Sequence, residues 1–544
     1  MASLFKNKVL ATSLSVSILM SGVIGGAVSA KEHKVPPGLE KKENIKVQLL
    51  SVNDLHGKIN VTEQPKNNPN KYGNAAYLAT YLKEREQTNE NTLIIHSGDM
   101  VGGSPPVSAL YQDEPTVEVM ESIGFDVGTV GNHEFDEGVD EMLRLIYGGD
   151  HPNGTVNYDG INFPMIAANV VYKDSEELVL PPYYIKNIKG QKIGFIGVAT
   201  TQTPNMVIAK GIQTINFTDE AEAINKFVPE LTKRGVEAIV VLAHVPGSQE
   251  GDTVTGEIAD IATKIDDEVD VIIAAHNHQK VNAMVDNKLI VQAWEYGKAF
   301  VDIDLEIDPV TGDIVKKEAE IVDVIQEGVT PDQKVSAILE KYSSAISSKL
   351  NEVVGVAGQF MEGGYATKAY FGDNALGNLI ADGMTAAMGS DFAMMNGGGI
   401  RADLNAGDIT WEELYNIQPF GNTLVKIEVA GSNMDEIINA QISDYGPDCS
   451  IAGFKYKWDS ATSKVTEVTL ADGTLLDENA TYTLTINNYM YEHNSDKYKL
   501  RAYGANPVQG TEDLTATIEF VKSFTSPIAY EAEGRIINIS AVAQ

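Results

Sequence analysis

The chain has 544 residues, 43% hydrophobic and 22% charged, which is long enough for two or more folded domains and too apolar for a disordered protein. Its formal net charge of −35 repels nucleic-acid backbones, so we expect no nucleic-acid polymer as a partner. A phosphate-bearing ligand would need strong local positive charge, which bound divalent cations can supply.

The chain begins with features of an export signal. Lys6 and Lys8 precede an apolar run from residue 9 to 28, and small residues up to Ala30 offer a cleavage site. Residues 1–30 are therefore predicted to be a signal peptide. The alternative is an uncleaved membrane anchor, which the Ser and Gly residues within the run disfavour. Residues 31–45, rich in Lys, Glu and Pro, predict a flexible leader.

These features place the chain outside the cell, where it either diffuses away or associates with the cell wall. No second stretch is apolar enough to serve as a membrane anchor. Cys449 is the only cysteine, which excludes an internal disulfide. The sequence leaves the oligomeric state open.

Residues 46–325 alternate β-branched runs with helical stretches and predict a layered α/β domain. Five of the apolar runs lead directly into residues that can bind metals, at Asn53–His56, His96–Asp99, Gly131–Glu134, His244 and His276–His278. Such loops converge at the carboxyl ends of strands in open α/β sheets. Imidazole and carboxylate together suit zinc, manganese, iron or cobalt better than calcium or magnesium. The pattern predicts two divalent metal ions at this edge.

The spacing within these loops supports shared metal centres. Asp54 and His56 are two residues apart, as are His276 and His278, so each pair can reach one ion. Asp99 can bridge two ions about 3.5–4 Å apart, one per carboxylate oxygen. His96 precedes this aspartate but is expected to be structural.

The ordered set resembles the calcineurin-like metallophosphoesterases. It consists of Asp54-x-His56, Gly98-Asp99 through Gly103-Ser104, Gly131 to Asp136, His244 and His276-x-His278. The resemblance implies an α/β/β/α sandwich. It also implies two metal shells, Asp54, His56, Asp99 and His278 in one, and Asp99, Asn132, His244 and His276 in the other.

The resemblance further implies that His133, oriented by Asp136, stabilises charge or protonates the leaving oxygen while an activated water attacks phosphorus in line. One departure is Ala274-Ala275, where many relatives carry two glycines.

Residues 326–354 are predicted to be a connector helix. Thr330 serves as the expected cap and Pro331 as the first helical residue. Apolar residues then recur at helical spacing, at Val335, Leu339 and Tyr342.

Residues 355–538 predict a second domain of mixed α/β structure with polar turns suited to a ligand. The glycine-rich turn Asn396–Arg401 lets the backbone approach a ligand closely and ends in a guanidinium that can bind phosphate. Phe420 and Tyr489 each follow a turn or strand end, and two such rings can sandwich a base, with about 1–3 kcal/mol per stacked base.

These turns resemble the C-terminal domain of the 5′-nucleotidase family, so that the resemblance covers about residues 46–538. It implies that Phe420 and Tyr489 stack on the base, that Asn396 and Arg401 contact the substrate, and that Asp496 contacts the sugar. It also implies that the second domain rotates about the connector helix to deliver the substrate.

The second domain departs from its relatives at two places. Gly372 stands where they carry an arginine, and residues 492–495 replace glycines. Both changes leave the substrate preference open, although not the class of reaction.

The predicted function is that of a secreted, dinuclear-metal 5′-nucleotidase acting on small-molecule nucleotides. Two alternatives use the same site, a 2′,3′-cyclic-nucleotide 2′-phosphodiesterase/3′-nucleotidase and a UDP-sugar diphosphatase. A non-catalytic surface nucleotide-binding protein is a third, which the presence of every expected ligand disfavours.

Overall fold

The computed structural model describes residues 43–65, 68–366, 372–443, 445–492 and 497–540. The predicted signal peptide, the leader up to residue 42 and Asp496 lie outside these ranges. Within them, no helix combines the length and the apolar character that crossing a bilayer requires.

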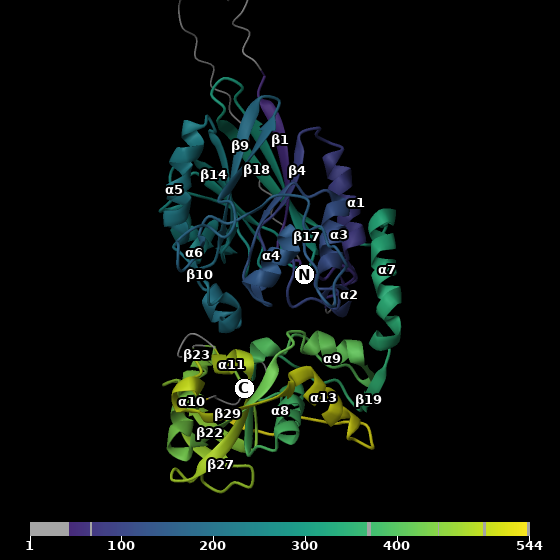
Figure 1. Ribbon diagram of the computed structural model, residues 1–544, viewed down its shortest axis with the longest axis vertical. Helices are drawn as coiled ribbons and strands as arrows, with labels where there is room; N and C mark the ends of the chain where they lie inside the picture. Colours follow the sequence, from purple (N-terminus) through teal and green to yellow (C-terminus); the bar gives the residue numbers. More distant parts are fainter. Residues whose placement is uncertain (1–42, 66–67, 367–371, 444, 493–496, 541–544) are drawn as a thin grey trace, which may run out of the picture. The chain divides into compact units, whose positions relative to one another are not determined.

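Two six-stranded mixed sheets form the first half of the fold (Figure 1). In spatial order the first contains β18 (Ile314–Asp323), β17 (Ala299–Ile307), β1 (Ile45–Val52), β4 (Thr92–His96), β5 (Val127–Thr129) and β6 (Met165–Ile166). The second contains β15 (Val281–Val285), β16 (Lys288–Gln292), β14 (Val269–Ile273), β11 (Ala238–His244), β9 (Gln191–Ala199) and β8 (Tyr183–Ile188).

Alternation along the strands produces the layers. Leu49 belongs to a core between the two sheets, together with Val240 from the second sheet. Its neighbour Leu50 points to the other face, where α1 (Ala75–Glu86), α3 (Glu114–Ile123) and α4 (Val139–Tyr147) cover the sheet. Val241 likewise faces α5 (Glu220–Lys233) and α6 (Glu257–Ala262). Because both faces of the central strands are buried, a strand such as β11 is apolar almost throughout, and the predicted α/β/β/α sandwich is confirmed.

Parallel strands bring their carboxyl ends to one edge of each sheet. β1, β4, β5 and β6 run parallel, with Val52 opposite His96 and His96 opposite Gly128. In the second sheet, β9, β11, β14 and β16 also run parallel. The predicted ligands follow these strands and are therefore delivered to the same edge.

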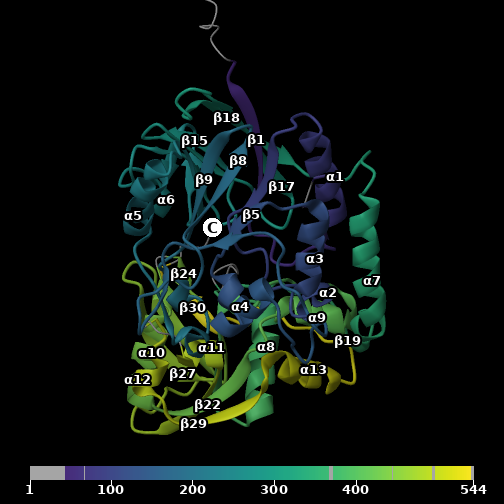
Figure 2. The same ribbon diagram turned by 45° about the horizontal axis from the view of Figure 1, so that its top comes forward.

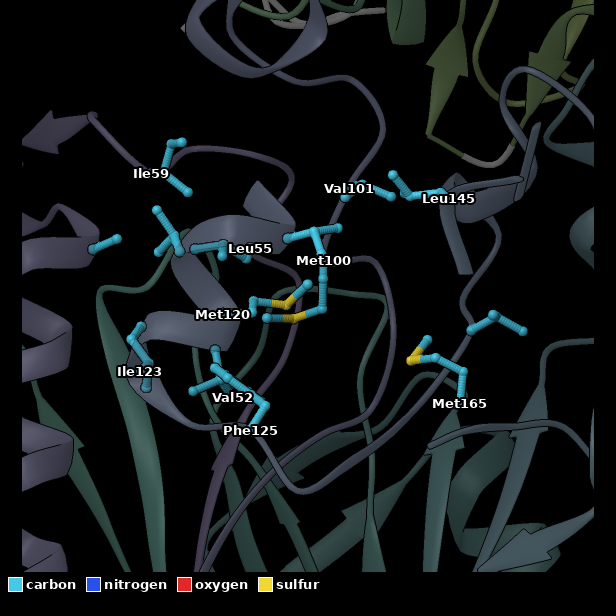
Figure 3. Close-up of a cluster of buried hydrophobic side chains, with 14 of the residues drawn as sticks. Val52, Leu55, Ile59, Met100, Val101, Met120, Ile123, Phe125, Leu145 and Met165 are labelled. Carbon is cyan, nitrogen blue, oxygen red and sulfur yellow. The ribbon is translucent and has the colours of Figure 1, made fainter. Parts of the chain in front are cut away.

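Apolar side chains anchor the loops at this edge. Leu55 lies between Asp54 and His56 in the sequence and is buried, as is Met100, which follows Asp99. Both belong to the core beneath α3 (Figure 3). Because these apolar neighbours point into the core, the predicted ligands beside them are turned toward the site.

Helix α7 (Gln333–Leu350) lies beside α1 and α3 (Figure 2). Its buried face includes Val335, Leu339 and Tyr342, as predicted. The predicted cap was wrong. Asp332 caps the helix, because its Oδ1 accepts the N–H groups of residues 334 and 335, each at 3.0 Å.

The second half of the fold surrounds a five-stranded mixed sheet in the order β25 (Ser450–Ala452), β20 (Phe392–Met395), β28 (Thr481–Asn487), β22 (Thr423–Ala430) and β29 (Ala505–Glu512). One face packs on α8 (Ala375–Met388) and α13 (Asp513–Lys522). The other packs on α10 (Met434–Ala440) and on a sheet of β27 (Lys464–Leu470), β26 (Phe454–Asp459) and β30 (Ile536–Asn538). The two-domain α/β fold is confirmed, whereas the boundaries 46–325, 326–354 and 355–538 stay predictions.

Candidate active site

The predicted ligands meet in two groups around Asp99. In one, the ligand atoms of Asp54, His56 and His278 lie within 4.8 Å of one another. In the other, those of Asp99, His244 and His276 do. Asp99 Oδ2 lies 3.0 Å from His244 Nε2 and 3.8 Å from His56 Nε2, so this oxygen stands between the groups.

The other oxygen of Asp99 is already engaged. Oδ1 accepts the backbone N–H of His133 at 2.8 Å. The sequence-based expectation that Asp99 bridges two cations, one per carboxylate oxygen, stays a prediction.

Backbone carbonyls orient two of the imidazoles. His56 Nδ1 donates to Gly102 O at 3.0 Å, and His244 Nδ1 donates to Ser97 O at 2.9 Å. A carbonyl only accepts, so Nδ1 carries the proton and Nε2 is left to face Asp99 as a ligand.

Three buried polar atoms at the edge have no hydrogen-bond partner among the described residues: Asn132 Oδ1, His244 Nε2 and His276 Nδ1. An unsatisfied buried group costs about 1–3 kcal/mol. The His244 nitrogen approaches Asp99 without the alignment of a hydrogen bond. Atoms of this kind, with carboxylates and further imidazoles around them, fit divalent transition metals.

Electrostatics at the edge follow from burial and from Asp99. Burial lowers the pKa of His276 to about 4 and that of His278 to about 3, which keeps both rings neutral. Burial raises the pKa of Asp54 to about 7. For His244, burial disfavours the charged ring, but Asp99 outweighs it and raises the pKa to about 9. A cation at this position would displace that proton.

The backbone at the edge adopts a conformation that L-residues rarely occupy. Positive φ angles of 50–84° occur at five of the seven predicted ligands, Asp54, His56, Asp99, His276 and His278. Such positions cost on the order of 1–3 kcal/mol each and concentrate at functional sites.

His133 and Asp136 form a pair beside the ligand groups. His133 Nδ1 lies 2.8 Å from Asp136 Oδ2, and the ring stands edge-on to His56. Burial disfavours the charged ring, but Asp136 and Asp99 outweigh it and raise the pKa of His133 to about 9. The ring can therefore hold a proton at neutral pH, as a general acid must.

Two residues that the sequence analysis did not single out position the ligands. Glu134 accepts the backbone N–H groups of Asp99 at 3.0 Å, Met100 at 2.8 Å and Gly131 at 2.6 Å. Asn53 Nδ2 donates to Asp54 Oδ2 at 2.6 Å. Both lie within the quoted motifs, next to a predicted residue, and that adjacency was the available signal.

A cavity of about 580 Å³ extends from the ligand groups, a size typical of small-molecule sites. Four of the five predicted substrate residues line it, namely Asn396, Arg401, Phe420 and Tyr489. The lining also includes Asn422, which belongs to the same turn as Phe420, and Tyr365, for which the sequence offered no motif. Asp496, the fifth, lies outside the described residues.

Phe420 contacts both His133 and Arg401 within the cavity lining. Its ring lies nearly parallel to that of His133, with centroids 6.1 Å apart, and the Arg401 guanidinium lies 5.6 Å from its centroid. Tyr489 donates from its hydroxyl to Asn205 O at 3.3 Å. The guanidinium and the two aromatic rings therefore line one space.

Two departures from the family pattern, at Gly372 and Ala275, lie in described segments, whereas residues 493–495 of the third lie outside the described residues. Gly372 has φ +90°, and a Cβ there would lie 2.9 Å from Ile536 O. The next residue, Asp373, accepts the N–H groups of Glu533 at 2.8 Å and Arg535 at 3.1 Å. This segment therefore holds the C-terminal strand. Ala275 is fully buried, and its N–H donates to Val245 O at 3.2 Å.

Comparison with known proteins agrees with this architecture. Residues 48–280 match the family described as calcineurin-like phosphoesterase, and residues 353–500 match the 5′-nucleotidase, C-terminal domain. A solved 5′-nucleotidase precursor from Thermus thermophilus superposes with a TM-score of 0.76 at 25% identity, over 92% of this chain and 100% of that one.

Two curated relatives are longer than this chain. Endonuclease YhcR of Bacillus subtilis is 56% identical over 502 residues, which cover 91% of this chain and 41% of the relative. Cell wall protein Lmo0130 of Listeria monocytogenes is 36% identical over 498 residues, which cover 82% of this chain and 63% of the relative. The chain thus spans less than two thirds of either.

Both domain families match in the expected order, and the fold brings together both predicted groups of ligands. The chain belongs to the metallophosphoesterase/5′-nucleotidase family of hydrolases, with a calcineurin-like domain followed by a 5′-nucleotidase C-terminal domain.

Proposed function

We propose that the chain is an extracellular 5′-nucleotidase that holds two divalent cations at the predicted ligands and removes phosphate from small-molecule nucleotides. One observation carries the proposal. A single cavity joins the ligands of both groups to Arg401 and to two aromatic rings, Phe420 and Tyr489.

The cations, when bound, would neutralise phosphate oxygens and acidify the attacking water. The chain's own residues do the rest. Asp99 holds the two groups of ligands together through Oδ2. Asp136 accepts a hydrogen bond from His133 Nδ1–H, which leaves the Nε2–H of the protonated ring to deliver a proton to the leaving oxygen.

The proposed substrate class follows from the other side chains that line the cavity. Arg401 is the only lysine or arginine among the described residues that line it, and a guanidinium suits phosphate oxygens. Phe420 and Tyr489 offer faces for a base, and Asn396 is held by a hydrogen bond from Asn487 at 2.8 Å. A phosphate ester without a base would leave the rings unused.

An extracellular location rests on the sequence of residues 1–30 and on the likeness to a protein named as a cell wall protein. N-terminal sequencing of the exported protein, from culture medium and from wall extracts, tests it. A mature N-terminus at Lys31 is expected.

A substrate panel tests the activity. Phosphate release is measured from AMP, 2′,3′-cyclic AMP and a UDP-sugar, with Mn, Zn, Co or Mg added. A single-stranded oligonucleotide is included because one relative is named an endonuclease. We expect AMP to be the best substrate, chelation to abolish turnover and re-addition of a cation to restore it. His133→Ala should lower kcat by about 10²–10⁴-fold. A purified protein without bound metal and without turnover of any substrate would overturn the proposal.

A further inference from the structure

A second cavity, of about 250 Å³, adjoins the wall of the main one. Residues 206–208 line the main cavity, whereas Lys210, on the same segment, lines the second. On helix α11 (Asn488–Glu492), Tyr489 faces the main cavity and Glu492 the second. The two cavities therefore flank one wall, at the end where the aromatic Tyr489 lies.

Three cations from separate elements gather at the second cavity. Lys173 follows β7 (Val170–Tyr172), Lys210 lies in η3 (Ala209–Ile212) and Arg501 in α12 (Leu500–Tyr503). None of them forms an ion pair with a described residue, although the chain has 76 acidic residues against 41 basic ones. Glu492 is the single acidic residue of the described lining. Among the described lining residues, three cations face one carboxylate, which is an excess of positive charge on a strongly negative protein.

The size and chemistry of the cavity define its ligand. Sites for whole drug-sized molecules measure about 300–1,000 Å³, so this space suits a phosphate or a sugar phosphate better than a second nucleotide. Arginine and lysine in one concavity suit phosphate oxygens, which accept several charge-assisted hydrogen bonds. Asn216 adds a neutral polar group to the lining.

We propose that Lys173, Lys210 and Arg501 form a second phosphate-binding site, distinct from the metal centre. Resting on the proposed function, the site takes the second phosphate group of a nucleotide whose first phosphate lies at the ligand groups. A nucleoside stacked on Tyr489 would lie in the main cavity, and its second phosphate would extend past the wall that contains Tyr489 to reach the three cations. Nucleoside 3′,5′-bisphosphates and 5′-phosphorylated dinucleotides have the required chemistry. Free inorganic phosphate is the other source of the same group.

Kinetics with one-phosphate and two-phosphate substrates test the site. We compare kcat/KM for AMP, adenosine 3′,5′-bisphosphate and a 5′-phosphorylated dinucleotide in the wild type and in Lys173→Ala/Lys210→Ala. The expected result is a loss of about tenfold for both two-phosphate substrates, expressed in KM, and less than twofold for AMP. The ratio of kcat/KM for a two-phosphate substrate to kcat/KM for AMP should therefore fall in this variant. Glu492→Gln, which removes the one carboxylate of the described lining, should raise that ratio. The matched control is Lys46→Ala/Lys233→Ala, which removes the same charge from exposed positions and should leave the ratio unchanged.

A measurement without turnover separates this site from the proposed activity. In excess chelator, tripolyphosphate should raise the melting temperature of the wild type and of the control variant but not of Lys173→Ala/Lys210→Ala. If inorganic phosphate gives the same shift at equal concentration while the kinetic ratio stays constant, the site binds free phosphate. An unchanged ratio together with no shift from either anion overturns the proposal, even if AMP is hydrolysed. A shift without hydrolysis of any substrate would instead refute only the proposed function.

Discussion

Glu134 accepts the backbone N–H of Asp99 at 3.0 Å, so a carboxylate from the loop after β5 sets the position of the central residue in the loop after β4. The same carboxylate binds the N–H of Gly131 at 2.6 Å and therefore ties the two loops together. Sequence order alone does not show this relationship, because the two loops are far apart along the chain.

Glu134→Ala should weaken cation binding. It leaves three backbone N–H groups without their acceptor, and loss of such outer contacts typically costs about 10–100-fold in metal affinity. Metal content after dialysis, and the concentration of cation that restores activity, measure the effect. Glu134→Gln keeps one acceptor oxygen, so its cation affinity should lie between those of the wild type and Glu134→Ala. Full metal retention by a folded Glu134→Ala protein would contradict the assignment.

Asp136→Asn should slow turnover without removing the cations. The amide can no longer stabilise a protonated His133, so we expect kcat to fall by about 10–100-fold with KM and metal content near wild-type values. Steady-state kinetics and metal analysis on the same preparation check both. A large rise in KM at constant kcat would place Asp136 in binding instead.

Phe420→Ala and Tyr489→Ala should discriminate between substrates with and without a base. Stacking of about 1–3 kcal/mol per base predicts a loss of about 5–150-fold in kcat/KM for AMP. For p-nitrophenyl phosphate, the change should stay within a few-fold. Tyr445→Ala, at a ring 92% exposed, serves as the control. Equal losses on both substrates would show that the rings support the fold and do not select a base.

Asp513 should make stability depend on pH. Burial raises the pKa of this carboxyl to about 8, against about 3.9 in an unfolded chain. The folded state therefore holds a proton that unfolding releases. Its contribution to stability is complete below pH ~4 and is lost as the pH rises through about 8. Relative to wild type, Asp513→Asn should gain melting temperature between pH 5 and 8. A difference that does not vary with pH would contradict the raised pKa.

Gly372→Ala should destabilise the fold more than Gly389→Ala. Both glycines have positive φ, but a Cβ at Gly389 meets nothing within 4 Å, whereas one at Gly372 lies 2.9 Å from Ile536 O. We expect about 1 kcal/mol for the open position and a clearly larger loss for the closed one, measured by denaturant unfolding. Equal losses would show that Ile536 does not restrict the side chain at position 372, where relatives carry an arginine.

The sequence predicted the layers and the location of the site for a physical reason. Runs such as residues 239–243 are apolar on both faces, so they must lie between layers, and a polar residue directly after them must lie at the sheet edge. Ordered motifs then separated His133, which has a predicted acid role, from His96, which packs against Phe125 and Phe163.

Contacts between distant backbone groups were not predictable. The N–H of His133 donates to Asp99 Oδ1, and Ile536 O limits the space at Gly372, so both contacts join residues far apart along the chain. Capping of α7 by Asp332 in place of Thr330 had a sequence signal, since Asp is also a preferred cap, but two candidates stood close together.

The left-handed backbone at Asp54, His56, Asp99, His276 and His278 limits how this protein can evolve. Glycine would relax each position and remove the ligand, while most other side chains would keep the strain and add nothing. A substitution at these five positions therefore cannot raise the thermal stability and also keep the predicted ligand. Stabilising substitutions must occur elsewhere in the chain.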